Sequence, residues 1–294
     1  MNRRAFMTSG LVAGTVFSVG ASGASSRASS EQDTSGDTKK VAKKDRLKQS
    51  VCQWCYGGKS LEELAAFSAK IGIKSIELVN PKGWPVLKKH GLICAMSNSG
   101  SLTEGLSHKK NHEKFLAKIR QSIDDTSEAG FPNVICFSGN RYGMDDDEGM
   151  KNCEIAIKQV IGYAEKKNVN LVMELLNSKV DHKDYMCDHS EWGVELAKRI
   201  GSPNFGLLYD IYHMQVQEGD IIATIKKHHE YFFHYHTAGV PGRHEIDESQ
   251  ELYYPAIVKA IVETGFKGYL GQEFVPTGSD PFGSLAKAVE ICDV

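Results

Sequence analysis

The sequence lacks an excess of charge of either sign. Its 294 residues carry 35 basic and 37 acidic side chains. A composition of 41% hydrophobic and 24% charged residues is that of soluble globular proteins, which excludes wholesale disorder and a many-span membrane protein. Residues 51–294 alone carry 26 basic and 33 acidic side chains, a net charge of −7. This charge argues against a nucleic-acid partner, because proteins that bind nucleic acids normally present a basic surface.

Histidine is absent from the first fifty residues, and eight of the eleven histidines follow residue 181. This uneven distribution indicates that the functional residues lie in the second half of the chain. The sequence also lacks a second CxxC pair that could complete a four-thiolate site with Cys52-Gln-Trp-Cys55. We therefore expect buried thiols without a redox role at all seven cysteines, which are Cys52, Cys55, Cys94, Cys136, Cys153, Cys187 and Cys292.

Residues 1–24 have the pattern of a signal peptide. Arg3-Arg4 precedes a short apolar stretch over residues 11–19 and small residues at 21–25. The arginine pair resembles a twin-arginine signal, which is read by a receptor; a chance pair in an ordinary secretory signal is the alternative. The apolar stretch is too short and too rich in glycine and serine to span about 30 Å of hydrocarbon, so we expect no stable membrane span after processing. The prediction is a periplasmic or secreted protein, cleaved near residues 21–24.

Residues 25–49 form a polar stretch without an aromatic side chain. Such a segment buries too little apolar surface to offset the entropy lost on ordering. We predict a disordered polar linker over residues 25–49 and a single catalytic domain over residues 50–294.

From residue 50 onward, short β-rich runs alternate with longer stretches of helical periodicity. The predicted strands are Val51–Cys55, Ser75–Val79, Leu92–Ser97, Val134–Ser138, Asn170–Leu175, Phe205–Asp210, Tyr231–Thr237 and Gly268–Phe274. The predicted helices are Leu61–Ile71, Trp84–His90, His112–Ala129, Gly149–Lys167, Ser190–Ile200, Ile221–His228, Leu252–Thr264 and Ser284–Cys292. Eight strand–helix units predict an α/β fold, a (β/α)8 TIM barrel. A doubly wound sheet would have fewer strands and a glycine-rich first turn.

The last four predicted strands carry an acidic residue or a histidine at their carboxyl ends, where a TIM barrel holds its functional residues. These ends carry Glu174, Asp210, His236 and Glu273. Buried carboxylates repel one another, so a group of them needs a cation or protons. Three carboxylates with one imidazole suit Mn²⁺, Mg²⁺ or Co²⁺ better than a structural Zn²⁺. Any one of them alone would more often be a salt-bridge partner or a core residue, but together they predict a metal site.

Four segments around these residues carry a family resemblance: Leu171–Glu174, Tyr209–Gln215, Ala238–Glu245 and Gly271–Phe274. They resemble the hydroxypyruvate isomerase family within the xylose-isomerase-like TIM barrel superfamily, over about residues 51–292. The resemblance implies that the four residues at the strand ends are the metal ligands. His236 departs from the family, which usually has glutamine there, and is similar to the ligand of related ketose epimerases. The substrate is therefore left open.

The resemblance also implies two substrate contacts, His213 and Arg243. For Arg243 the alternative is a salt bridge within its loop, to Glu245 or Asp247. Glu77, at the end of the second predicted strand, is a further candidate for substrate binding, with a capping role as the alternative. Trp54, after the first strand, is a candidate for the pocket wall or for the core.

The function implied by the resemblance is a metal-dependent isomerase or epimerase of a small sugar or hydroxy-keto acid. Glu174 and Glu273 would transfer the proton through an enediolate. Return of the proton to the neighbouring carbon isomerises the substrate, and return to the opposite face epimerises it. Two alternatives stay open: a non-catalytic carbohydrate-binding barrel of the cell envelope and, less favoured by the acidic body, an endonuclease-IV-like phosphodiesterase. The oligomeric state is open, a homo-oligomer included.

Overall fold

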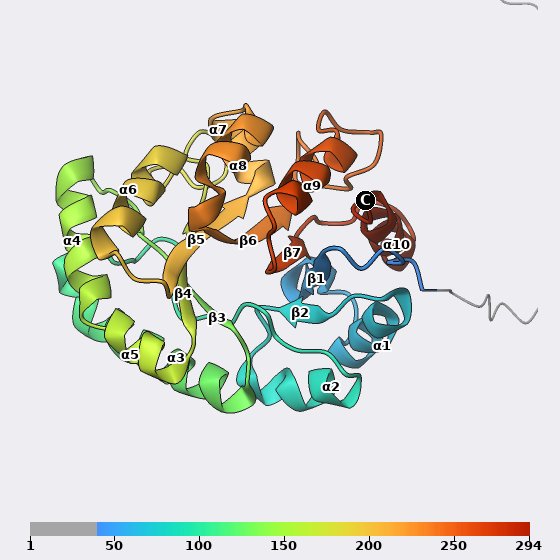
Figure 1. Cartoon of the computed structure of the whole chain (residues 1–294), viewed down its shortest axis with the longest axis horizontal. Coiled ribbons are helices and arrows are strands. Elements are labelled where there is room, and N and C mark those ends of the chain that lie inside the picture. The colour runs from blue at the N-terminus through green and yellow to red at the C-terminus, as the bar shows by residue number, and fades with distance from the viewer. Residues whose placement is uncertain (1–39) are drawn as a thin grey trace, which may run out of the picture. The chain divides into compact units, whose positions relative to one another are not determined.

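A curled sheet of parallel strands lies at the centre of the fold, and helices surround it (Figure 1). The computed structural model describes residues 40–294. The predicted signal peptide and residues 25–39 of the predicted linker lie outside the described residues. The strands run in the order β2-β1-β7-β6-β5-β4-β3, which confirms the predicted TIM barrel. They are β1 (Lys48–Cys52), β2 (Ser75–Glu77), β3 (Asn133–Cys136), β4 (Asn170–Leu175), β5 (Phe205–Asp210), β6 (Phe232–Thr237) and β7 (Tyr269–Gln272).

The predicted third strand, Leu92–Ser97, does not form a regular strand. One parallel bridge near each end of this segment joins it to β2 and β3 and so links the two edges of the sheet. Between the bridges, the backbone N–H of Ala95 donates to Ser75 Oγ at 2.8 Å, and the carbonyl of Ala95 accepts from Asn133 Nδ2 at 2.8 Å. At Ala95 two side chains thus take the place of backbone partners, while Ile93 and Ser97 keep backbone hydrogen bonds to β2 and β3. This interruption is why the segment closes the barrel without being a regular strand.

Ten α-helices occur in the described residues, and four of them have the predicted bounds: Leu61–Ile71, His112–Ala129, Ser190–Ile200 and Ile221–His228. Local signals set these ends. Ser60 and Glu63 form a capping box before the first of them, and Gly72 ends it in the left-handed conformation. None of the helices in residues 40–294 has both the length and the apolar composition needed to cross a membrane. The helices are α1 (Leu61–Ile71), α2 (Trp84–Lys89), α3 (His112–Ala129), α4 (Asp146–Lys158), α5 (Ile161–Lys167), α6 (Ser190–Ile200), α7 (Ile211–Gln217), α8 (Ile221–His228), α9 (Tyr254–Glu263) and α10 (Pro281–Ile291).

The remaining differences have local causes. The predicted helix over residues 149–167 is two helices, α4 and α5. Helix α7 was not predicted; Asp210, the last residue of β5, caps it by accepting from the backbone N–H of His213. Helix α10 begins earlier than predicted because Pro281 suits a first turn and Asp280 accepts from the backbone N–H of Gly283.

The end of the predicted linker, residues 40–49, lies against the barrel. The backbone N–H groups of Val41 and Ala42 both donate to the carbonyl of Ile71, and Ala42 is buried. Strand β1 begins at Lys48. Residues 40–49 are therefore part of the folded domain, whereas the sequence placed them in the linker.

All seven cysteines are buried and free, as predicted. The predicted first strand, Val51–Cys55, needs correction. Strand β1 ends at Cys52, and Gln53–Tyr56 forms a 3₁₀ turn, so the two cysteines of the CxxC pair do not lie on one strand.

Replacement of Ser75 by alanine tests the closure of the barrel. The Ser75→Ala change leaves the buried N–H of Ala95 without an acceptor, and we expect the free energy of unfolding to fall by about 1–3 kcal/mol. Ser68→Ala is the matched control, since the Ser68 hydroxyl in α1 is equally buried but has no hydrogen-bond partner among the described residues. Denaturant unfolding measures both. Equal losses would argue against the role given to Ser75.

Candidate metal centre

Four side chains meet above the carboxyl ends of β4, β5, β6 and β7. Alternation along each strand turns every second residue toward the barrel interior. Glu174 and His236 are the next-to-last residues of β4 and β6, Asp210 is the last residue of β5, and Glu273 directly follows β7. Asp210 and His236 are direct partners in the β5–β6 ladder, so two of the predicted ligands are neighbours on adjacent strands.

The four predicted ligands lie close together and are all buried. Nδ1 of His236 is 2.9 Å from Glu273 Oε2, 3.7 Å from Glu174 Oε1 and 4.0 Å from Asp210 Oδ2. One ligand atom from each residue lies within 4.8 Å of every other. The predicted quartet is therefore a cluster in space.

Two atoms of this cluster point to a missing partner. Asp210 Oδ2 and His236 Nδ1 are buried, and neither makes a well-aligned hydrogen bond among the described residues, even though Nδ1 lies 2.9 Å from Glu273 Oε2. A buried polar atom without a partner is costly, so such atoms mark places where an ion or ligand binds. Three carboxylates and one imidazole match the donors preferred by Mn²⁺ and related divalent ions. The residues present thus fit the metal that the sequence suggested.

Burial and charge move the pKa values of the three carboxyl groups in different directions. Burial raises the pKa of Glu174, and it raises the pKa of Asp210 to about 8. Burial alone would also raise the pKa of Glu273, but His236 and Arg243 outweigh it and hold this pKa well below its ordinary value. Ionisation of Glu174 and Asp210 is thus unfavourable in this buried site, and a bound divalent cation would relieve that cost.

Arg243, on the loop after β6, reaches into this cluster. Its Nη2 donates to Glu273 Oε2 at 2.7 Å and lies 3.7 Å from Asp210 Oδ2. The guanidinium carbon lies 5.1 Å from the centre of the Trp54 ring, within range of a cation–π interaction. The salt bridge to Glu245 or Asp247 that the sequence left open as an alternative is not formed; Arg243 belongs to the site.

His213 stands beside the cluster, in the first turn of α7. Its ring is fully buried, and its Nδ1 lies 2.6 Å from Asn177 Nδ2. Its Nε2 is 3.9 Å from Asp210 Oδ2 and has no hydrogen-bond partner among the described residues. Burial and the nearby Arg243 charge hold the pKa of His213 well below its ordinary value, so the ring is neutral at physiological pH.

Glu77 does not occupy the place that substrate binding would require. It is fully buried at the end of β2, behind the imidazole of His236. Its Oε2 lies 3.0 Å from His236 Nε2 and 2.9 Å from His234 Nε2, and its Oε1 accepts from the Ser50 hydroxyl. Burial alone would raise its pKa, but the two histidines bring it to about 2. Glu77 therefore contacts His236, one of the four predicted ligands, in place of the predicted contact with substrate.

Two further residues belong to the site. Trp54 donates from Nε1 to Glu273 Oε1 at 2.9 Å while 46% of the residue stays exposed, so it borders the site rather than the core. His234 was not among the predicted site residues because a histidine in an aromatic-rich strand is usually a core residue. Its spacing of two from His236, which puts both rings on the interior face, is the signal that could have found it.

Comparison with known proteins gives a consistent picture. A family model described as xylose isomerase-like TIM barrel matches residues 65–292. A human protein provisionally named hydroxypyruvate isomerase is 23% identical over 231 residues, covering 76% of this chain and 78% of the human one. The 2-oxo-tetronate isomerase of Pectobacterium atrosepticum is 26% identical over 232 residues, covering 74% of this chain and 87% of that protein.

Solved structures resemble the same part of the chain. The AP endonuclease, family 2, of Brucella melitensis superposes with a TM-score of 0.74 at 22% identity and covers 82% of this chain and 98% of its own. The 3-keto-D-glucoside 4-epimerase of E. coli superposes with a TM-score of 0.70 at 15% identity, with the same coverage of both chains. At these identities the likeness shows the fold alone.

The Arg243 loop is held by Glu245, which provides a test by pH. The Glu245 carboxylate accepts from the backbone N–H and the hydroxyl of Thr277, both at 2.8 Å, and from the backbone N–H of Gly278. Burial would raise the pKa of Glu245, but these hydrogen bonds lower it from 4.5 to about 2. A lowered pKa stabilises the folded state above pH 4.5, and this stabilisation is lost as the pH falls toward 2.

We therefore expect Glu245→Gln to be less stable than wild type at pH 7, with a difference that shrinks between about pH 4.5 and pH 2. Thermal unfolding across this range measures the difference. Asp247→Asn is the control, because Asp247 lies in the same loop but bonds only to Ser249 within it. A difference that stays constant with pH would contradict the role of the Glu245 carboxylate.

Proposed function

The chain belongs to the xylose isomerase-like TIM barrel family, and from this premise we propose that it is a metal-dependent isomerase or epimerase of a small sugar or hydroxy-keto acid. The observation that carries the proposal is the buried cluster of Glu174, Asp210, His236 and Glu273, whose ligand atoms all lie within 4.8 Å of one another. The isomerases among its relatives support the same class of reaction.

The proposed reaction needs a polarised carbonyl and a carboxylate beside it. A divalent ion held by the four ligands, Mn²⁺, Mg²⁺ or Co²⁺, would supply the Lewis acid that polarises the substrate carbonyl. Glu174 and Glu273 are the proposed acid–base pair: one carboxylate removes the proton from the carbon next to the carbonyl, and one returns a proton. Their place on β4 and just after β7 puts them on separate strands of the barrel.

The cationic Arg243 and the neutral His213 would orient the substrate. Arg243 Nε is buried and has no hydrogen-bond partner among the described residues, and the same holds for His213 Nε2. Both atoms can bind oxygens of a hydroxyl, carbonyl or carboxylate group. Trp54 borders the site and would shield part of it from water.

The substrate is proposed to be carbohydrate-derived. His236 replaces the glutamine usual in hydroxypyruvate isomerases, and the E. coli protein with a similar fold is named as an epimerase of a keto-glucoside. An exported enzyme would also meet sugars more readily than hydroxypyruvate, an intracellular metabolite. Isomerisation and epimerisation share the same proton abstraction, so both products are to be sought.

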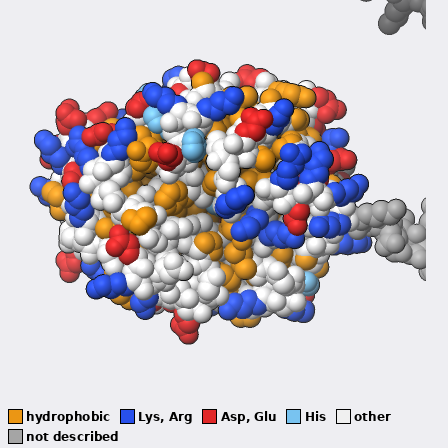
Figure 2. All heavy atoms as spheres, viewed as in Figure 1, with side chains coloured by type: hydrophobic (Ala, Val, Ile, Leu, Met, Phe, Trp, Pro, Cys, Tyr) orange, Lys and Arg blue, Asp and Glu red, His pale blue; other side chains and the backbone are white. Residues whose placement is uncertain are grey.

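The two alternative functions have less support. A non-catalytic binding barrel would not need two glutamates at the metal cluster. A phosphodiesterase would be expected to have more histidine ligands and a basic surface, whereas residues 51–294 carry a net charge of −7. On the face seen in Figure 2, acidic and basic side chains are interspersed around uncharged and apolar surface.

Solvent proton exchange tests the proposed reaction. With Mn²⁺ present, we expect the wild-type protein to exchange the proton next to the carbonyl of a ketose, aldose or hydroxy-keto acid in D₂O, as measured by NMR. Glu273→Gln should lower this rate by about 10²–10⁴-fold because the base is lost. Glu263→Gln, an exposed carboxylate of α9, is the control and should exchange at the wild-type rate.

Absence of exchange with every substrate of a broad panel, in protein shown to hold the metal, would exclude the proposed reaction and leave the two alternative functions. Wild-type exchange by metal-replete Glu273→Gln would remove Glu273 from the mechanism.

We also propose that residues 1–24 direct export of the folded protein through the twin-arginine route. The support is the sequence pattern alone: Arg3-Arg4, a short apolar stretch and a small-residue exit. Replacing both arginines by lysine should leave the protein uncleaved and inside the cell, as judged by fractionation and by the N-terminus of the product. Normal export of the double variant would favour an ordinary secretory signal.

A further inference from the structure

A layer of polar side chains lies inside the barrel directly below the metal cluster. Ser50, Glu77 and His234 come from β1, β2 and β6, and all three are fully buried. The interior of a TIM barrel is usually filled by branched apolar side chains. A buried polar layer is costly unless every member is paired, so its presence calls for a physical reason.

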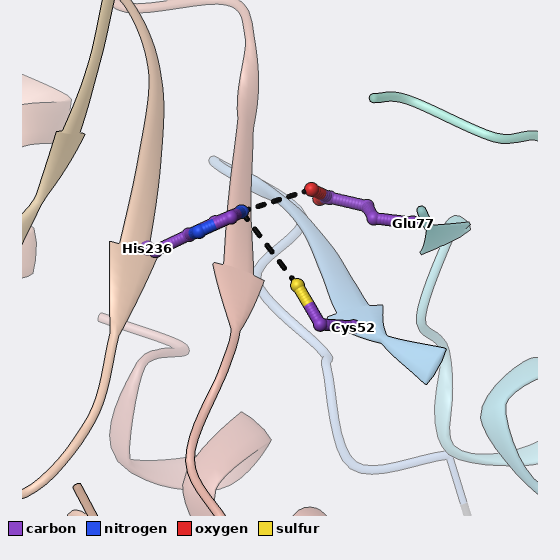
Figure 3. A group of neighbouring side chains, drawn as sticks. All are labelled: Cys52, Glu77 and His236. Carbon is purple, nitrogen blue, oxygen red and sulfur yellow. Dashed lines mark hydrogen bonds and ion pairs between the residues drawn. The ribbon is translucent and has the colours of Figure 1, made fainter. Parts of the chain in front are cut away.

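The layer is organised around one carboxylate. Glu77 Oε2 lies between the Nε2 atoms of His236 and His234, at 3.0 and 2.9 Å. Its other oxygen accepts from the Ser50 hydroxyl. Figure 3 shows the Glu77 carboxylate facing the edge of the His236 ring that carries Nε2. The opposite edge carries Nδ1, which lies 2.9 Å from Glu273.

We propose that Glu77 is a positioning residue, which fixes the orientation and tautomer of His236 so that Nδ1 is the metal-binding atom. This inference rests on the proposed function, because it assumes that His236 is a ligand. The reason is that an imidazole has two nitrogens, and a carboxylate that accepts from Nε2–H leaves the lone pair on Nδ1. Nδ1 is also the atom that makes no well-aligned hydrogen bond among the described residues.

Gly271 gives independent support for a fixed imidazole. It is the direct neighbour of His236 in the β6–β7 ladder. A Cβ atom at position 271 would lie 2.7 Å from His236 Cδ2 and 3.0 Å from Glu77 Oε1, closer than side chains tolerate. Glycine thus leaves the space in which His236 and Glu77 meet.

Cys52, Glu77 and His236 could also be taken for a second cation site, since they lie close enough to share an ion. Their contacts favour the positioning role instead. Both oxygens of Glu77 already have partners in Ser50 and the two histidines. Burial raises the pKa of the Cys52 thiol well above its ordinary value, so this sulfur stays protonated and is a poor ligand.

The affinity for Mn²⁺ tests the proposal. We expect Glu77→Gln to bind Mn²⁺ about 10–100-fold more weakly than wild type, as measured by the EPR signal of free Mn²⁺, because a neutral amide accepts from the Nε2–H of His236 more weakly than a carboxylate does. Asp188→Asn is the matched control: Asp188 is buried and paired with Arg141, not with a metal ligand, so its loss should affect stability and leave Mn²⁺ affinity unchanged.

Two further measurements distinguish a loss of imidazole positioning from a general loss of folded structure. In the Zn²⁺-loaded wild-type protein with ¹⁵N-labelled histidine, NMR should identify Nδ1 of His236 as the coordinating nitrogen and Nε2 as protonated. Gly271→Ala should also weaken Mn²⁺ binding, because the added methyl group displaces the His236 ring while the Glu77 carboxylate is kept. This variant tests the proposal even if Glu77→Gln does not fold.

The outcomes are distinct. Coordination of Zn²⁺ through Nε2, or wild-type Mn²⁺ affinity in both Glu77→Gln and Gly271→Ala, would overturn the positioning role while leaving the proposed function intact. Wild-type protein that takes up no Mn²⁺ would overturn the metal-dependent function, and this inference with it.

Discussion

Repulsion among three buried carboxylates is the constraint on which the upper half of the barrel depends. Glu174, Asp210 and Glu273 come within a few ångströms of His236, where little water can screen them. A buried cluster of this kind stays folded only when cationic or proton-donating groups offset it. Arg243 supplies one such charge from the loop above, and the fit of the remaining donors to a divalent ion indicates how the rest is neutralised.

The cluster of candidate ligands could be predicted from the sequence because its members obey local rules. Period-two alternation and the ends of consecutive parallel strands suffice to bring Glu174, Asp210 and His236 to one rim. The same local rules placed α1, whose capping box and terminal glycine lie within the sequence of the helix itself. Helix α7 escaped prediction because Asp210 has two roles at once, as a strand end that carries a ligand and as the cap of the next helix.

What the sequence could not provide are pairings between distant side chains. The backbone of Ala95 finds its partners in the side chains of Ser75 and Asn133, so a segment with a strand-like pattern closes the barrel partly through side chains. Arg243 has two acidic neighbours in its own loop, yet its partner is Glu273, thirty residues away and beyond the next strand. The register of the sheet and the path of the loops determine these pairings, and neither can be predicted from a local sequence pattern.

The identity of the fourth ligand illustrates how far these distant pairings reach. A glutamine, which the related isomerases are expected to have at this position, offers an amide oxygen whose lone pairs need no choice of tautomer. A histidine offers two nitrogens, only one of which can face the carboxylates, and the other must be satisfied inside the barrel. In this chain Glu77 lies at that second nitrogen, and Gly271 leaves room for the contact. A histidine ligand and the polar layer below it are therefore one feature, and replacing the ligand alone would leave a buried carboxylate with one partner fewer.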